Sequence, residues 1–122
     1  MATHNYRQLE AYQTAFQLGL DVLQLSSKLP HTANETITKG LLNASQMVSV
    51  SIAEGWARRT RPGSLETHLS DATDALNELH LWLMVGKQLE AIDNKQYKGV
   101  ATLTQVLTVQ LESLKQYWLV YN

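Results

Sequence analysis

The sequence lacks cysteine altogether and has only two prolines and one phenylalanine among its 122 residues. Without cysteine, the chain forms neither a disulfide nor a thiolate metal site, which excludes the disulfide-stapled secreted scaffolds. Apolar runs are no longer than LWLMV at 81–85, and residues 1–13 contain no apolar segment. The sequence therefore predicts neither a membrane span nor a signal peptide, and we expect a cytoplasmic protein.

Charge is scarce as well. Charged residues make up 17% of the sequence and hydrophobic residues 44%, whereas an ordinary soluble domain is about 25% charged. This imbalance suggests that part of the apolar surface meets other subunits. The net charge of −1 provides no general attraction for a polyanion, so any nucleic-acid contact must be local. The length is that of one domain, residues 1–122.

Helical periodicity fills the space between a few breaks, and strand signals are nearly absent. Leu29-Pro30 and TRPGS at 60–64 are the clearest breaks, so we expect helices at about 6–28, 33–59, 64–91 and 94–120. Ser64 is the expected N-cap of the third helix, and the pairs Thr32/Glu35 and Asp93/Gln96 have capping-box spacing. Four such helices with short connections predict an all-α, antiparallel up-down-up-down four-helix bundle.

Two apolar stripes run along the first and the last helix, although a bundle helix needs only one. We expect the core to hold Leu9, Tyr12, Phe16, Leu20 and Leu23; Ile37, Leu41, Ala44 and Val48; Leu65, Leu69, Ala72, Leu76, Leu79 and Leu83; and Val100, Leu103, Leu107, Leu114 and Trp118. The second stripes are Leu18, Val22, Leu25 and Leu29, and Val106, Val109, Val120 and Tyr121. They predict a homo-oligomer.

Positive charge gathers between the second and third helices, at Arg58, Arg59 and Arg61. Cations at a helix C-terminus stabilise the helix dipole, and Glu54 stands four residues before Arg58, so a purely structural role is one explanation. Three planar guanidiniums also suit phosphate or carboxylate recognition. We call Arg58, Arg59 and Arg61 the basic corner, the candidate site for nucleic acid or an acidic partner.

Three neighbours support the basic corner: Glu54, Gly55 and Trp56. Glycine within a helix costs about 1 kcal/mol relative to alanine, so Gly55 is expected to allow a neighbouring helix close to the backbone. Trp56 is expected to be buried, with stacking on a base as the alternative.

Acids and histidines gather on the third helix, at Glu66, His68, Asp71, Asp74, Glu78 and His80. They lack the Glu-x-x-His pairs of di-iron bundles, so we expect a solvated acidic face, no metal and no cofactor. Neither a G-x-S-x-G elbow nor a glycine-rich phosphate loop is present. Arg61 and His68 resemble the R-x(4–6)-H motif of HEPN-type ribonucleases, which makes a metal-independent ribonuclease an alternative function. A purely structural assembly is a third hypothesis.

The segment SIAEGWAR at 51–58 resembles the motif N-I-A-E-G-x-x-R of the four-helix bundle proteins encoded within intervening sequences of bacterial 23S ribosomal RNA genes. The opening (Tyr6, Leu9, Tyr12, Ala15), the end of the first helix (Lys28, Pro30) and Ala75, Leu76, Glu78 and Leu79 also match. Leu42 and Asn43 depart from a frequent arginine pair, and Ser49 from a frequent proline.

The relatives of this family include the accessory variability determinant of diversity-generating retroelements, a basic protein that binds nucleic acid and its reverse transcriptase. The resemblance implies a homo-oligomeric, pentameric barrel without established enzymatic activity. We therefore expect a non-enzymatic oligomeric scaffold whose basic corner contacts RNA, DNA or a protein partner such as a reverse transcriptase, away from any membrane.

Overall fold

The computed structural model describes residues 5–29 and 35–121. A 3₁₀ turn at Tyr6–Gln8 precedes four helices: α1 (Glu10–Ser27), α2 (Glu35–Ala57), α3 (Ser64–Gln88) and α4 (Asn94–Tyr121). The described ranges contain no strand. Pro30, Thr32 and the side chain of Tyr121 lie outside what is described, and so does the expected Thr32/Glu35 capping box.

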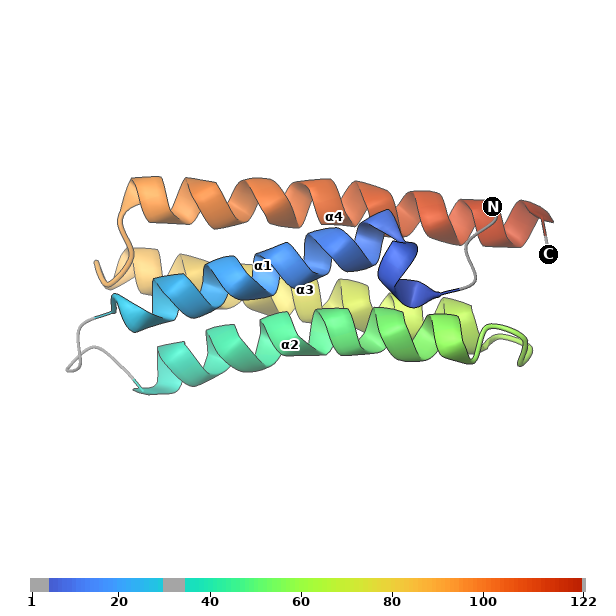
Figure 1. Ribbon diagram of the computed structural model, residues 1–122. Coiled ribbons are helices and arrows are strands. Elements are labelled where there is room, and N and C mark those ends of the chain that lie inside the picture. The colour runs from blue at the N-terminus through green and yellow to red at the C-terminus, as the bar shows by residue number, and fades with distance from the viewer. Residues whose placement is uncertain (1–4, 30–34, 122) are drawn as a thin grey trace.

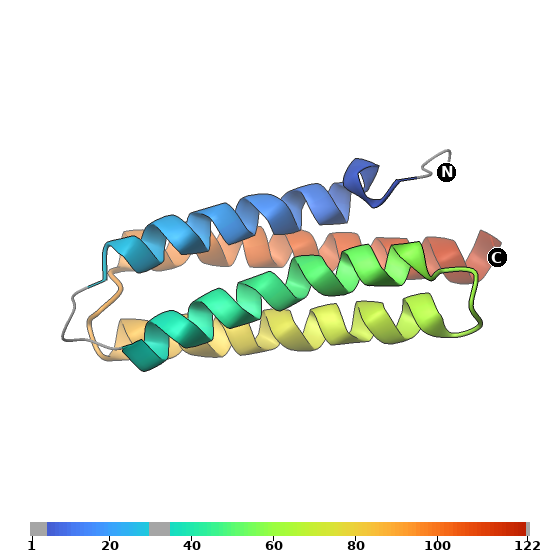
Figure 2. The same ribbon diagram turned by 60° about the horizontal axis from the view of Figure 1, so that its bottom comes forward.

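The four helices lie side by side and alternate in direction (Figures 1 and 2). Each of α1 and α3 packs against both α2 and α4, and the α2–α3 contact is the most extensive. The prediction of an all-helical four-helix bundle is confirmed. The α2–α3 turn and the C-terminal end of α4 lie at one end of the bundle, and the α3–α4 turn lies at the other (Figure 1).

The ends of the helices test the local sequence signals. Asp93 N donates to Gln96 Oε1 at 2.9 Å and Gln96 N donates to Asp93 Oδ1 at 2.7 Å, which confirms the second capping box. The expected Ser64 N-cap is wrong, because Gly63 occupies that position with a left-handed φ of 75° and α3 begins at Ser64 itself. Helix α3 ends at Gln88, earlier than expected, because Glu90 has a positive φ of 61° and closes the helix.

The stripe predicted to be the core side of the first helix is wrong. Phe16, Leu20 and Leu23 are 55%, 43% and 56% exposed, although Leu9 is buried and Tyr12 packs partly against the core. The stripe assigned to subunit contacts is the inward one: Leu18, Val22 and Leu25 are buried together with Ala11 and Ala15, and Leu29 packs against them. Ala11 and Ala15 explain why this stripe faces inward, since their small side chains let α1 approach the core closely.

The other predicted stripes lie where expected. The apolar residues predicted for α2 and α3 are all buried, and on α4 Val100, Leu107 and Leu114 are buried while Leu103 and Trp118 pack partly against the core. The second stripe of α4 is exposed at Val106, Val109 and Val120. Within the described residues, no helix is both long enough and apolar enough to cross a bilayer.

Candidate nucleic-acid interface

The basic corner lies on a tightly hydrogen-bonded turn at residues 58–63. Arg58 N donates to Glu54 O at 3.1 Å and Arg59 N to Trp56 O at 3.3 Å, which ends α2. Arg61 N then donates to Arg58 O at 3.0 Å and Ser64 N to Arg61 O at 3.1 Å, and these bonds lead the chain into α3. The turn therefore holds the backbone of all three arginines in one place at the end of the bundle.

Arg59 is folded back onto the protein. Its Nη1 donates to the carbonyl oxygen of Trp56 at 2.8 Å, and its Cζ lies 4.5 Å from the centroid of the Trp56 ring. Trp56 itself is only 3% exposed, so the expected buried role is confirmed and no base can stack on it. The guanidinium of Arg59 thus satisfies a carbonyl at the end of α2 and covers a buried indole.

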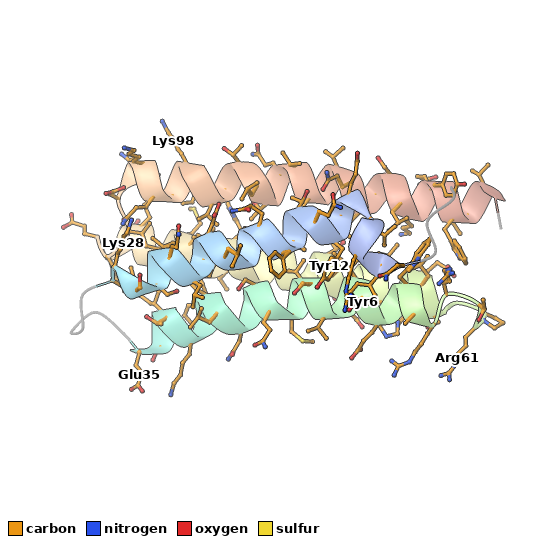
Figure 3. All side chains as sticks on the ribbon, in the orientation of Figure 1. Tyr6, Tyr12, Lys28, Glu35, Arg61 and Lys98 are labelled. Carbon is orange, nitrogen blue, oxygen red and sulfur yellow. The ribbon has the colours of Figure 1, made fainter. Side chains whose placement is uncertain are left out.

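Arg58 and Arg61 face solvent. Arg58 Nη1 lies 3.7 Å from Glu54 Oε2, and both side chains are about half exposed, so this ion pair is weak. The Arg61 side chain points away from the bundle (Figure 3), and among the described residues no hydrogen bond or ion pair occupies its guanidinium. The corner therefore offers one free guanidinium and one that is loosely paired, beside a third that is held by Trp56.

Gly55 brings α2 against α3 directly behind the corner. A Cβ atom at Gly55 would lie 2.6 Å from the Cβ of His68, so the expected close helix packing is present. His68 Nδ1 lies 2.8 Å from Ser64 O and therefore donates to that carbonyl, while Nε2 lies 3.8 Å from Glu54 Oε2. The same oxygen of Glu54 thus faces both Arg58 and His68.

A hollow of about 520 Å³ opens beside the turn, between the start of α3 and the end of α4. Its lining includes Arg59, Arg61, Gly63, Glu66, Trp118 and Leu119. Trp118 is partly buried and contacts the Trp56 ring edge-on at 5.8 Å. Sequence reasoning did not assign Glu66 or Trp118 to this site, and only the antiparallel topology, which returns the end of α4 to the α2–α3 turn, brings them there.

Residues 7–113 match the family described as 23S rRNA-intervening sequence protein. The chain belongs to this family. The match includes SIAEGWAR and the whole basic corner, so the resemblance drawn from that motif is confirmed. No curated protein matches the chain.

The structure also places the residues of the ribonuclease and metal-site hypotheses. Arg61 lines the hollow, whereas His68 does not and packs between α2 and α3. The acids Asp71, Asp74 and Glu78 are exposed along α3. Across residues 5–29 and 35–121, no three histidine, aspartate or glutamate side chains are grouped closely enough to hold a metal ion.

Proposed function

We propose that this protein is a homo-oligomeric helical scaffold that binds nucleic acid through the basic corner of Arg58, Arg59 and Arg61. The observation that carries the proposal is that two of the three guanidiniums have no strong partner. In a chain whose net charge is −1, Arg61 has no partner in the described structure and Arg58 has only an exposed one. Contacts from such groups to phosphates are sensitive to salt and largely independent of base sequence.

The exposed apolar side chains of α1 and α4 support the oligomeric part of the proposal. Phe16, Leu20 and Leu23 on α1 and Val106 and Val109 on α4 lie outside the core, on helices that pack against each other. Phe16, Leu20 and Leu23 are spaced four and three residues apart and so share one face of α1, and a contiguous exposed apolar face marks a contact with another protein. A second copy of the chain is the occupant we propose, and the family resemblance implies five copies. In a ring, the corner would recur at each subunit and bind a polyanion multivalently.

Binding is tested by titrating labelled RNA and DNA, single-stranded and structured, at low and physiological salt. The decisive variant is Arg58→Ala/Arg61→Ala, which spares the structural Arg59. Its control, Lys28→Ala/Lys98→Ala, removes the same charge at the opposite end of the bundle (Figure 3). We expect the arginine variant to lose the gel shift and the lysine variant to keep it. Equal losses would mean that net charge, not the corner, governs binding.

The same titration separates the other functions. Denaturing gels run in parallel would show shortened RNA if the protein were a ribonuclease, and His68→Ala would then have to stop the cleavage. Intact probes without any shift would reject nucleic-acid binding and favour a scaffold for a protein partner, such as an acidic protein or a reverse transcriptase.

Assembly is tested by the mass in solution. We expect Leu20→Glu/Val109→Glu to reduce the particle to a 13.7 kDa monomer, because a charge on each helix disrupts an apolar contact. Leu81→Glu is the control, since Leu81 is 59% exposed but lies on α3. A monomeric wild-type protein would contradict the proposal, and so would an unchanged mass in the double variant.

A further inference from the structure

The hollow beside the basic corner has the size of a ligand site. Its volume of about 520 Å³ falls in the range of about 300–1,000 Å³ that is typical of small-molecule sites. It opens next to the turn that carries Arg61, which also contributes to its lining. A nucleic-acid strand held at the corner would therefore pass the mouth of the hollow.

Trp118 provides a fixed aromatic surface in this hollow. Its ring packs against that of Trp56 in a T-shaped arrangement, with an interplanar angle of 66°, and Trp56 is covered in turn by the Arg59 guanidinium. A ring that is already held in place loses little conformational entropy when a base stacks on it. Stacking on an aromatic ring is the main way in which proteins bind unpaired bases.

Glu66 contributes a negative charge and hydrogen-bond acceptors to the hollow. It is the only acid in the lining, it is half-buried, and the described residues give its carboxylate no hydrogen-bond or ion-pair partner. An ionised carboxylate only accepts hydrogen bonds and repels phosphate. The Glu66 carboxylate is therefore suited to a base with hydrogen-bond donors, whereas a phosphate would lie against the Arg61 guanidinium, which points away from the bundle.

Guanine fits this requirement best among the four bases. Its Watson–Crick edge carries two adjacent donors, N1–H and the N2 amino group, which match the two oxygens of a carboxylate. Adenine and cytosine each offer one amino group at that edge, and uracil offers one imino group. In a duplex the guanine donors are already paired, so only an unpaired guanine is available to Glu66.

We propose that the hollow formed by Glu66, Trp118 and the 58–63 turn binds an unpaired guanine of a single-stranded nucleic acid. This inference rests on the proposed function, because the arginines must first bind the strand. It adds a preference for single strands over duplexes and for guanine over other bases, neither of which phosphate contacts alone provide.

The test measures fluorescence anisotropy with labelled single strands that contain uridine and one central guanosine, inosine or adenosine, and with a duplex. Inosine lacks the N2 amino group and is otherwise guanosine, so it isolates one donor. We expect the guanosine strand to bind at least about fivefold more tightly than the inosine strand. Glu66→Gln should abolish this difference, while Asp71→Asn, an exposed acid on the same helix, should preserve it.

Trp118→Leu should weaken single-strand binding about tenfold and leave duplex binding unchanged. Circular dichroism checks its folding, and the partly exposed Glu66 variant supplies an independent test if Trp118→Leu does not fold. Salt-sensitive binding without preference for guanosine or for single strands would overturn this inference and leave the proposed function standing. Failure to bind any probe would overturn both.

Discussion

Gly55→Ala should destabilise the bundle, although alanine favours a helix over glycine. The new Cβ atom would lie 2.6 Å from His68 Cβ and 3.3 Å from Leu65 Cδ1, whereas carbon atoms pack best at about 3.5–4.0 Å. His68 Cβ is attached directly to the backbone, so relief requires α2 and α3 to separate. The variant therefore tests the close packing of α2 against α3 behind the basic corner.

The size of the effect follows from comparison with Gly99, an exposed glycine on α4 where an added Cβ atom would meet nothing within 4 Å. Gly99→Ala should gain most of the helix preference, about 0.5–1 kcal/mol. Gly55→Ala has the same gain but also an overpacking cost of about 1–3 kcal/mol. We expect the two variants to differ by about 1–3 kcal/mol, with Gly55→Ala the less stable.

Urea unfolding followed by far-ultraviolet circular dichroism measures this difference, at one protein concentration because assembly contributes to stability. The wild-type protein should unfold between the two variants. If Gly55→Ala stabilises the protein as much as Gly99→Ala does, α2 and α3 do not pack closely at this point and the reasoning is refuted.

Three further predictions concern the corner and the capping box. Arg59→Ala should lower stability by about 1–2 kcal/mol, because it removes the bond to Trp56 O and the cover over the Trp56 ring, and Arg58→Ala should change it by less than about 0.5 kcal/mol in the same urea assay. Glu54→Gln should tighten nucleic-acid binding about two- to fivefold in an anisotropy titration, since it releases Arg58 from its exposed pair; weaker binding would contradict this. Asp93→Ala should cost about 1 kcal/mol of unfolding free energy, and no change would mean that the bond to Gln96 N contributes nothing.

The sequence predicted the fold well where the apolar pattern allowed one choice. On α2 and α3 the sequence predicted one apolar stripe for each helix, and both stripes are buried. On α1 two stripes compete, and the prediction assigned Phe16, Leu20 and Leu23 to the core, although all three are exposed. The deciding property was the small size of Ala11 and Ala15, which matters only when the neighbouring helices are in place.

The arginine cluster of the candidate site was predictable from the sequence, but the contacts that each arginine makes were not. Three arginines in a short segment are visible in the sequence, yet their partners depend on rotamers and on distant residues. Arg59 covers Trp56, while Arg61 extends into solvent. Trp118 reaches the same end of the bundle only because α4 runs antiparallel to α3 (Figure 2), so its part in the hollow could not be assigned from local sequence.

The salt dependence of binding tests the central claim most directly. Affinity falls as salt is added, and for a single-stranded probe each phosphate contact makes the plot of log affinity against log salt concentration steeper by about 0.7. If Arg58 and Arg61 each contact one phosphate, Arg58→Ala/Arg61→Ala should reduce the slope by about 1.4 per bound subunit, and Lys28→Ala/Lys98→Ala should leave it unchanged. An unchanged slope in the arginine variant would contradict the assignment of nucleic-acid binding to the basic corner.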